Sequence, residues 1–260
     1  MLKRIVVASC VLLSTTPLMA QGCSDLGSAH PPFNWKRIQP LILLTEYNPW
    51  AMAIGSDSPS FALYADGTVI YWSGDRRSGE YMTATLNSSG ITKLLDSAHV
   101  DKVSVLKDCY IIEDNVTDLP TNVLVVKTGD VYKTIEIYGV IRPAENIPSS
   151  RIPTSLKEAL QALLSFETPT AQKWKPAYLE VILWPFSYAK SSVPWPATFP
   201  GVDDKNTQHS NSGIELFLPI SDLEQYKAFV SKLRPTQAVM LDGKKWAITA
   251  RTPFPHEGKP

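Results

Sequence analysis

The stretch FALYADGTVIYW, residues 61–72, carries the clearest structural signal in the chain. Five residues rich in apolar and aromatic side chains lie on each side of the Asp66-Gly67 pair, which is the strongest short-range signature of a two-residue hairpin loop. Such a loop pairs Leu63 with Ile70 across the strands. Because both faces would then be apolar or aromatic, we expect a central hairpin covered on both sides, with Asp66 as a turn residue rather than a catalytic acid.

Two further hairpins are predicted by the same turn chemistry. Residues 121–139 turn at Gly129-Asp130, and residues 238–250 turn at Asp242-Gly243. Glycine and aspartate tolerate the positive φ angles that tight hairpin turns require. The chain is therefore expected to build its sheets from hairpins.

Three short helices are predicted between the strands. Residues 91–98 follow Asn87-Ser88-Ser89, which can cap a helix. Two S-x-x-E sequences, at 155–158 and 221–224, match the capping box. Each signal is followed by apolar side chains at helical spacing, so we expect three amphipathic helices with one buried face each.

The predicted class is α+β, with antiparallel sheets built from hairpins and a few short capped helices. The order strand, capped helix, hairpin occurs at 81–139 and again at 214–250, which suggests two similar halves. We expect a first half at 41–166 and a second at 177–254. The residues between them, ETPTAQKWKP, have the composition of a linker.

The first 20 residues have the three-part pattern of a secretory signal peptide: a basic start, an apolar run at 5–13 and a small residue, Ala20, at the end. The apolar run is too short to span a bilayer as a helix. Residues 21–40 are polar and broken by prolines, as in an extended lead-in. We therefore expect an exported protein in the periplasm or outside the cell.

The cysteines leave three alternatives open: a disulfide, which is favoured, a lipid on Cys23, or two free thiols. If cleavage follows Ala20, the mature chain keeps Cys23 and Cys109, and an even pair in an oxidising compartment favours a disulfide between them. Residues 20–23, AQGC, also resemble a bacterial lipobox, in which Cys23 would carry a lipid that anchors the protein to the membrane. Cys109 would then be a lone thiol.

Composition and motifs argue against several functional classes. Lys+Arg and Asp+Glu number 25 each, so no net charge favours nucleic acid or anionic lipid. With 21 prolines, seven tryptophans and 44% hydrophobic residues, the chain has the composition of a loop-rich globular protein. The sequence lacks the hydrolase elbow, the P-loop, H-E-x-x-H and paired C-x-x-C patterns. It favours a non-enzyme, and we expect no catalytic residue, cofactor or metal.

Short matches to known catalytic patterns carry little weight. S-x-x-K at 104–107 and 187–190, with K-T-G at 127–129, are pieces of the penicillin-binding protein and serine β-lactamase signature, but their order and spacing do not fit that mechanism. His99 and Cys109 could form a Cys-His pair, yet a disulfide would abolish the thiolate that such a pair needs.

Two polar segments are candidates for binding a cation. Residues 108–118 gather four acidic side chains around Cys109, and the loop 201–213 contains two aspartates, Asn206 and His209. Neither has the ligand spacing of an ordered calcium loop. Solvated loops are the favoured interpretation, and cation binding at either segment stays open.

The most unusual composition lies between residues 173 and 201, where aromatic residues alternate with prolines. Aromatic side chains on proline-stiffened loops can stack on glycan rings or anchor a partner protein. They can equally cover the core of the second half. The predicted binding residues are Trp184, Phe186, Tyr188 and Trp195.

The segment LYADGTVIYW, the helix signal after it and the strand PTNVLVV resemble uncharacterised exported envelope proteins and lipoproteins of bacteria, in which a strand-Asp-Gly-strand unit recurs. The closing WAITARTPFPHE is similar to the end of such chains. The resemblance implies a bacterial envelope location and no catalytic residue. We expect a binding protein with an envelope protein or cell-wall glycan as its partner. The alternative is a periplasmic hydrolase of envelope material that uses unrecognised residues.

Overall fold

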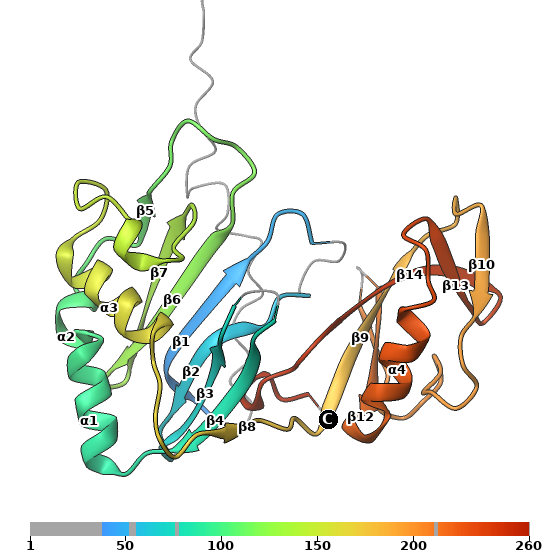
Figure 1. Ribbon diagram of the computed structural model, residues 1–260, viewed down its shortest axis with the longest axis horizontal. Coiled ribbons are helices and arrows are strands. Elements are labelled where there is room, and N and C mark those ends of the chain that lie inside the picture. Colours follow the sequence, from blue (N-terminus) through green and yellow to red (C-terminus); the bar gives the residue numbers. More distant parts are fainter. Residues whose placement is uncertain (1–37, 52–55, 76–77, 211–212, 260) are drawn as a thin grey trace, which may run out of the picture.

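The computed structural model describes residues 38–51, 56–75, 78–210 and 213–259, which form two β-sheets with helices packed on one face of each (Figure 1). The predicted signal peptide and most of the predicted lead-in therefore lie outside the described residues. The arrangement confirms an α+β protein with mixed, mainly antiparallel sheets.

The first sheet has eight strands in the order β5-β7-β6-β1-β2-β3-β4-β8, and only the β5–β7 pairing is parallel. Its strands are β1 (Pro40–Tyr47), β2 (Pro59–Tyr64), β3 (Thr68–Ser73), β4 (Glu80–Thr85), β5 (Cys109–Ile111), β6 (Thr121–Thr128), β7 (Val131–Tyr138) and β8 (Gln172–Lys173). Helices α1 (Ser88–Ser97), α2 (Val100–Val103) and α3 (Thr154–Leu164) cover one face, and the short turn η2 (Ala144–Asn146) precedes α3.

The second sheet has six strands in the order β10-β13-β14-β9-β12-β11, with β10–β13 as its parallel pair. Its strands are β9 (Tyr178–Pro185), β10 (Ser191–Pro194), β11 (Gln208–Ser210), β12 (Gly213–Pro219), β13 (Gln237–Leu241) and β14 (Lys244–Arg251). The turn η3 (Ile220–Asp222) leads into helix α4 (Leu223–Val230), which packs on one face, and η4 (Pro255–Glu257) lies near the C-terminus.

The similarity of the two halves is not confirmed. In the first sheet, β6, the first strand of its hairpin, lies next to β1. In the second sheet, β14, the second strand of its hairpin, lies next to β9. The same order of elements along the chain is therefore placed differently in the two sheets.

The hairpin at 61–72 forms as expected, but its predicted register is wrong by one residue. Leu63 pairs with Val69, not with Ile70, because the loop contains three residues instead of two. Gly67 alone adopts a positive φ, of 86°, while the Asp66 carboxylate accepts a hydrogen bond from the amide of Thr68 at 2.9 Å. A one-residue shift moves every side chain of β3 to the opposite face of the sheet. Both faces of the hairpin are nevertheless buried, as predicted.

The other two hairpins are confirmed with two-residue loops. Thr128 pairs with Val131, and Leu241 pairs with Lys244. At the second of these turns both Asp242 and Gly243 have positive φ angles, of 51° and 67°. This is the backbone that the Asp-Gly signature predicts.

The helices form where the apolar spacing predicts them, but two of the predicted caps are wrong. Asn87 caps α1 by accepting a hydrogen bond from the amide of Gly90 at 2.8 Å. Helix α3 instead begins earlier, because the carbonyl of Pro153 accepts its first hydrogen bonds and Ser155 lies inside the first turn. Ser221 similarly lies within η3, and its hydroxyl donates to Asp222.

The segment predicted as a linker is attached to the first sheet. Its strand β8 pairs with β4, where Met82 lies opposite Lys173. The amide of Trp174 then donates to the carbonyl of Tyr81 at 2.8 Å. The chain thus enters the second sheet from a fixed position on the edge of the first.

Gly67 is the position where the fold most needs a glycine. A Cβ atom there would lie 2.2 Å from the backbone oxygen of Leu86, in addition to the cost of a positive φ. We expect Gly67→Ala to lower the free energy of unfolding by more than about 2 kcal/mol. Urea unfolding followed by circular dichroism measures this change.

Two other glycines serve as controls for this prediction. Gly129 has a φ of 59° but no atom near its Cβ position, so Gly129→Ala should cost only about 1 kcal/mol. Gly201 has neither constraint, and Gly201→Ala should change stability by less than about 0.5 kcal/mol. Equal effects at all three sites would contradict this account of Gly67.

Candidate functional site

The four predicted aromatic binding residues do not form one exposed surface. Trp195 is a core residue, 7% exposed, and packs edge-on against Phe199 and Phe229 at ring distances of 5.3 and 5.7 Å. Its indole N–H donates to the carbonyl of Pro200 at 2.9 Å. Trp184 is half-buried in β9. The structure therefore separates Trp195 from the rest of the predicted site.

The exposed part of the predicted site is the turn 186–189. Tyr188 is 82% exposed, and the half-buried ring of Phe186 meets it edge-on at 4.8 Å. Three hydrogen bonds hold the backbone: the Phe186 amide to the Lys245 carbonyl at 2.9 Å, the Ala189 amide to the Phe186 carbonyl at 3.1 Å, and the Lys245 ammonium to the Ala189 carbonyl at 2.7 Å. The turn thus presents an aromatic ring on a fixed backbone.

Sheet topology explains why this turn is held so firmly. The connection from β9 to β10 must cross β14 and β13, because those strands lie between them. The neighbouring Trp246 faces α4, so the side chain of Lys245 points to the opposite face, where it binds the connection. On the same face, Ala238 and Ala247 are only 0% and 7% exposed. Such small buried side chains allow the backbone of the connection to lie close to the sheet.

The remaining catalytic candidates are not brought together. His99 adopts a φ of 47° between α1 and α2, and its Nε2 lies 2.9 Å from Oε2 of Glu158 in α3. The S-x-x-K at 187–190 lies in the connection from β9 to β10, whereas the K-T-G at 127–129 lies at the turn between β6 and β7. The S-x-x-K at 104–107 lies between α2 and β5, in the same half of the chain as the K-T-G. Ser104 lies at the end of α2 and Ser187 in a turn, so neither S-x-x-K begins a helix as its mechanism requires.

The acidic segment 108–118 has its carboxylates directed to separate partners. Asp108 pairs with Lys133, Asp114 receives a bidentate contact from Arg151, and Glu113 accepts a hydrogen bond from the amide of Val140. In the loop 201–213, Asp204 accepts from the amide of Asn206. Within the described residues, no group of three or more His, Cys, Asp or Glu side chains is placed to hold a metal ion.

The disulfide prediction reaches beyond the described part of the chain. Cys109 lies in β5 and is half-buried, while Cys23 is outside the described residues. The pairing of Cys23 with Cys109 and the lipidation of Cys23 both stay predictions.

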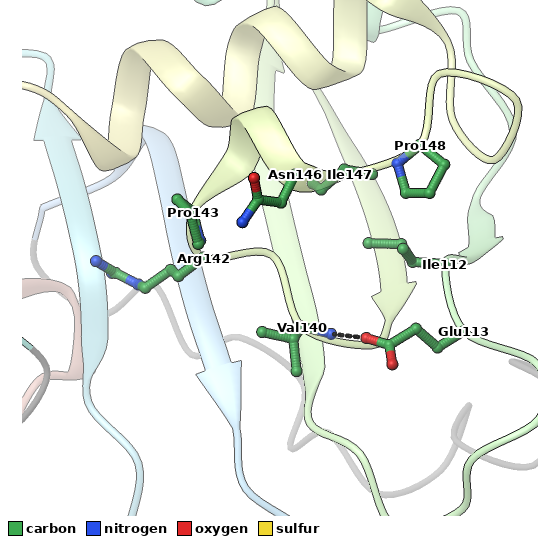
Figure 2. A pocket seen from close by; sticks show the side chains of 8 residues that line it. All are labelled: Ile112, Glu113, Val140, Arg142, Pro143, Asn146, Ile147 and Pro148. Atoms are coloured by element: carbon green, nitrogen blue, oxygen red, sulfur yellow. Dashed lines mark hydrogen bonds between the residues drawn. The ribbon is translucent and has the colours of Figure 1, made fainter.

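An open hollow of about 340 Å³ lies between the ends of β5 and β7 and the turn η2 (Figure 2). Its lining is mostly apolar, with Glu113 on one side and Arg142 pointing away from it on the other. The Val140 amide holds one oxygen of Glu113 at 3.2 Å. The size suits a small apolar group or one side chain of a partner, but no pair of groups here is arranged for proton transfer.

A buried cluster of charges at the junction of the two sheets was missed by sequence reasoning. Arg251 of β14 lies opposite Glu180 of β9, and Arg251 Nη2 is 2.6 Å from Glu180 Oε2. Arg251 also pairs with both carboxylate oxygens of Glu257. Lys259 pairs with Glu215 and lies 3.4 Å from Glu180 Oε1. Glu180 is only 1% exposed and Arg251 only 9%, so these ions are held by one another rather than by water.

Burial and charge act in opposite directions on these groups. Burial raises the pKa of Glu180, although Arg251 and Lys259 act to lower it. For Arg251, burial acts to lower the pKa, but the carboxylates of Glu257 and Glu180 hold it above its ordinary value. Arg251 therefore stays charged at the junction.

The residues after Arg251 leave the second sheet and pack on the first (Figure 1). The hydroxyl of Ser58 donates to the Thr252 carbonyl at 2.9 Å and accepts from the Thr252 amide at 3.1 Å. Phe254 packs edge-on against Trp174 and Tyr81 at 4.9 and 5.4 Å. This covers the face of the first sheet opposite its helices.

His256 completes this contact. Its Nδ1 lies 2.8 Å from the hydroxyl of Tyr64, deep in the same face. Burial lowers the pKa of His256 to about 4, and burial also raises the pKa of Tyr64 well above its ordinary value. At neutral pH the pair is therefore an uncharged imidazole and an uncharged phenol.

One signal in the sequence could have indicated this cluster. Glu180 is the single charged residue in the otherwise apolar strand at 178–184, and a charge in a buried strand needs a partner. That its partner is Arg251 depends on the β9–β14 pairing, which no local pattern reveals.

Comparisons with known proteins give no relative. No family model matches the sequence, and no curated protein or solved structure matches it. The resemblance to exported envelope proteins accordingly stays an expectation. Among the described residues, none of the helices has the length and apolar character needed to cross a membrane.

Removal of Arg251 should strongly destabilise the fold. Arg251→Met leaves Glu180 and Glu257 buried without their cation, so we expect the free energy of unfolding to fall by about 3–5 kcal/mol. Chemical unfolding at pH 7 measures this loss.

A matched control is Arg151→Met, which removes an equally bidentate contact with Asp114 at an exposed site. That variant should unfold close to the wild-type midpoint, because exposed ion pairs contribute little. Comparable losses in both variants would show that burial is not what makes Arg251 important.

Proposed function

We propose that this protein is an exported bacterial envelope protein that acts by binding a protein or glycan partner and that the turn 186–189 forms part of its contact surface. The observation that carries the proposal is the 82% exposure of Tyr188 on a backbone held by three hydrogen bonds. Aromatic side chains with little conformational freedom are favoured as binding anchors, because little entropy is lost on contact.

Export is supported by the signal-peptide pattern of the first 20 residues. The mass of the mature protein and its count of free thiols distinguish the alternatives for Cys23. A lipid on Cys23 would add to its mass and place the protein at a membrane surface, whereas a Cys23–Cys109 disulfide would lower the count of free thiols by two.

The binding proposal is tested with Tyr188→Ala. The mature wild-type protein is incubated with the envelope fraction of its source cell and, separately, with purified cell-wall sacculi. Partners captured from the envelope are then purified and titrated against each variant. We expect Tyr188→Ala to weaken the dissociation constant at least about tenfold, as for a binding hot spot.

Val105→Ala is the matched control, because Val105 is also 82% exposed but lies in the first half of the chain. It should bind as the wild type does. Equal binding by Tyr188→Ala and wild type would remove the turn from the proposed surface. Release of soluble fragments from the sacculi would instead identify the protein as a hydrolase of envelope material.

A further inference from the structure

The C-terminal segment 252–259 joins the two sheets without belonging to either of their hydrogen-bonded ladders. It starts from Arg251 at the end of β14, inserts Phe254 and His256 into the first sheet, and returns to the second sheet through the pairing of Lys259 with Glu215. Pro253 and Pro255 lack amide N–H groups, which limits the hydrogen bonds this segment can form.

Each sheet has a core that does not include this segment. The helices α1 to α3 pack on one face of the first sheet, and α4 packs on one face of the second. Phe254 belongs to a third, smaller cluster on the opposite face of the first sheet, together with Tyr64, Ile70 and Val125. The segment can therefore leave that face without breaking either of the larger cores.

His256 is the group in this contact that changes charge under mildly acidic conditions. Among the described residues, the titratable and charged groups around it include Tyr64 from β2, Arg251 from β14 and its neighbour Glu257. Both oxygens of Glu257 accept hydrogen bonds from Arg251. A proton on His256 would place a positive charge in a site that is 5% exposed, and this burial is its largest cost, while Glu257 favours the proton and Arg251 opposes it.

We propose that the segment 252–259 is an acid-sensitive clasp: protonation of His256 releases it from the first sheet and uncovers the aromatic face around Tyr64, Tyr81 and Trp174, while both sheets stay folded. The proposal goes beyond the proposed binding function and does not depend on it.

The direction of the pH effect follows from the two states of His256. Its pKa is about 4 in the clasp and about 6.5 when the segment is free, so the clasp gains stability from neutral His256 above pH 6.5 and loses it as the pH falls toward 4. Glu180 is buried in β9, which stays folded on release, so the burial that raises its pKa is common to both states.

Hydrogen exchange of the full mature protein at pH 7.0 and pH 4.5, corrected for intrinsic rates, tests the clasp. Protection of peptides covering 252–259 should fall by tens of fold, with about 60-fold as the limit set by His256 alone. Peptides from β6 and β9 should keep their protection. Unchanged protection of 252–259, or a loss that accompanies loss in β6 and β9, would overturn the proposal.

Two variants assign the effect to His256. His256→Phe keeps a ring but cannot be protonated, so the protection of 252–259 in this variant should change far less between the two pH values than in the wild type. If the segment is already open in His256→Phe at pH 7.0, the experiment uses His256→Gln instead. The glutamine amide cannot be protonated in this pH range but can still form a hydrogen bond with Tyr64. A wild-type-like loss of protection in a variant whose segment is closed at pH 7.0 would contradict the assignment.

Discussion

The joint between the two sheets depends on one buried cation. Arg251 is the last residue of β14. It lies opposite Glu180 of the neighbouring strand β9 and forms ion pairs with Glu180 and with Glu257 of the C-terminal segment. Three ionised groups out of water are costly unless each finds its counterion. That requirement fixes the direction in which the chain leaves β14, and the contacts of Phe254 and His256 with the first sheet follow from it.

This joint also explains why the first sheet can be apolar on both faces. One face is covered by α1, α2 and α3. The other face is partly covered by Phe254 and Trp174, which come from outside the sheet. A sheet with two apolar faces would otherwise expose a surface prone to association. The C-terminal segment thus links the two halves, because ion pairs hold it to the second sheet and apolar contacts hold it to the first.

Much of the secondary structure could be predicted from local patterns, because turns and amphipathic spacing act over a few residues. The hairpins at Gly129-Asp130 and Asp242-Gly243 form as expected. The register at 61–72 could not be fixed, because the choice between a two-residue and a three-residue loop depends on Leu86, whose amide donates to the carbonyl of Gly67. The predicted aromatic site was divided for a similar reason: Trp195 packs on α4, which is distant in sequence. The pairing of Glu180 with Arg251 could not be predicted either, because these residues are also distant in sequence.

The coupling of the two sheets through the C-terminal segment is most directly tested by urea unfolding followed by pulsed hydrogen exchange in β6 and β9. The wild-type protein should lose protection in both strands at the same urea concentration at pH 7, because the attached C-terminal segment couples their unfolding. In Phe254→Ala the two midpoints should separate, as the sheets lose their shared contact. Separate midpoints in the wild type, or coincident midpoints in Phe254→Ala, would contradict the account.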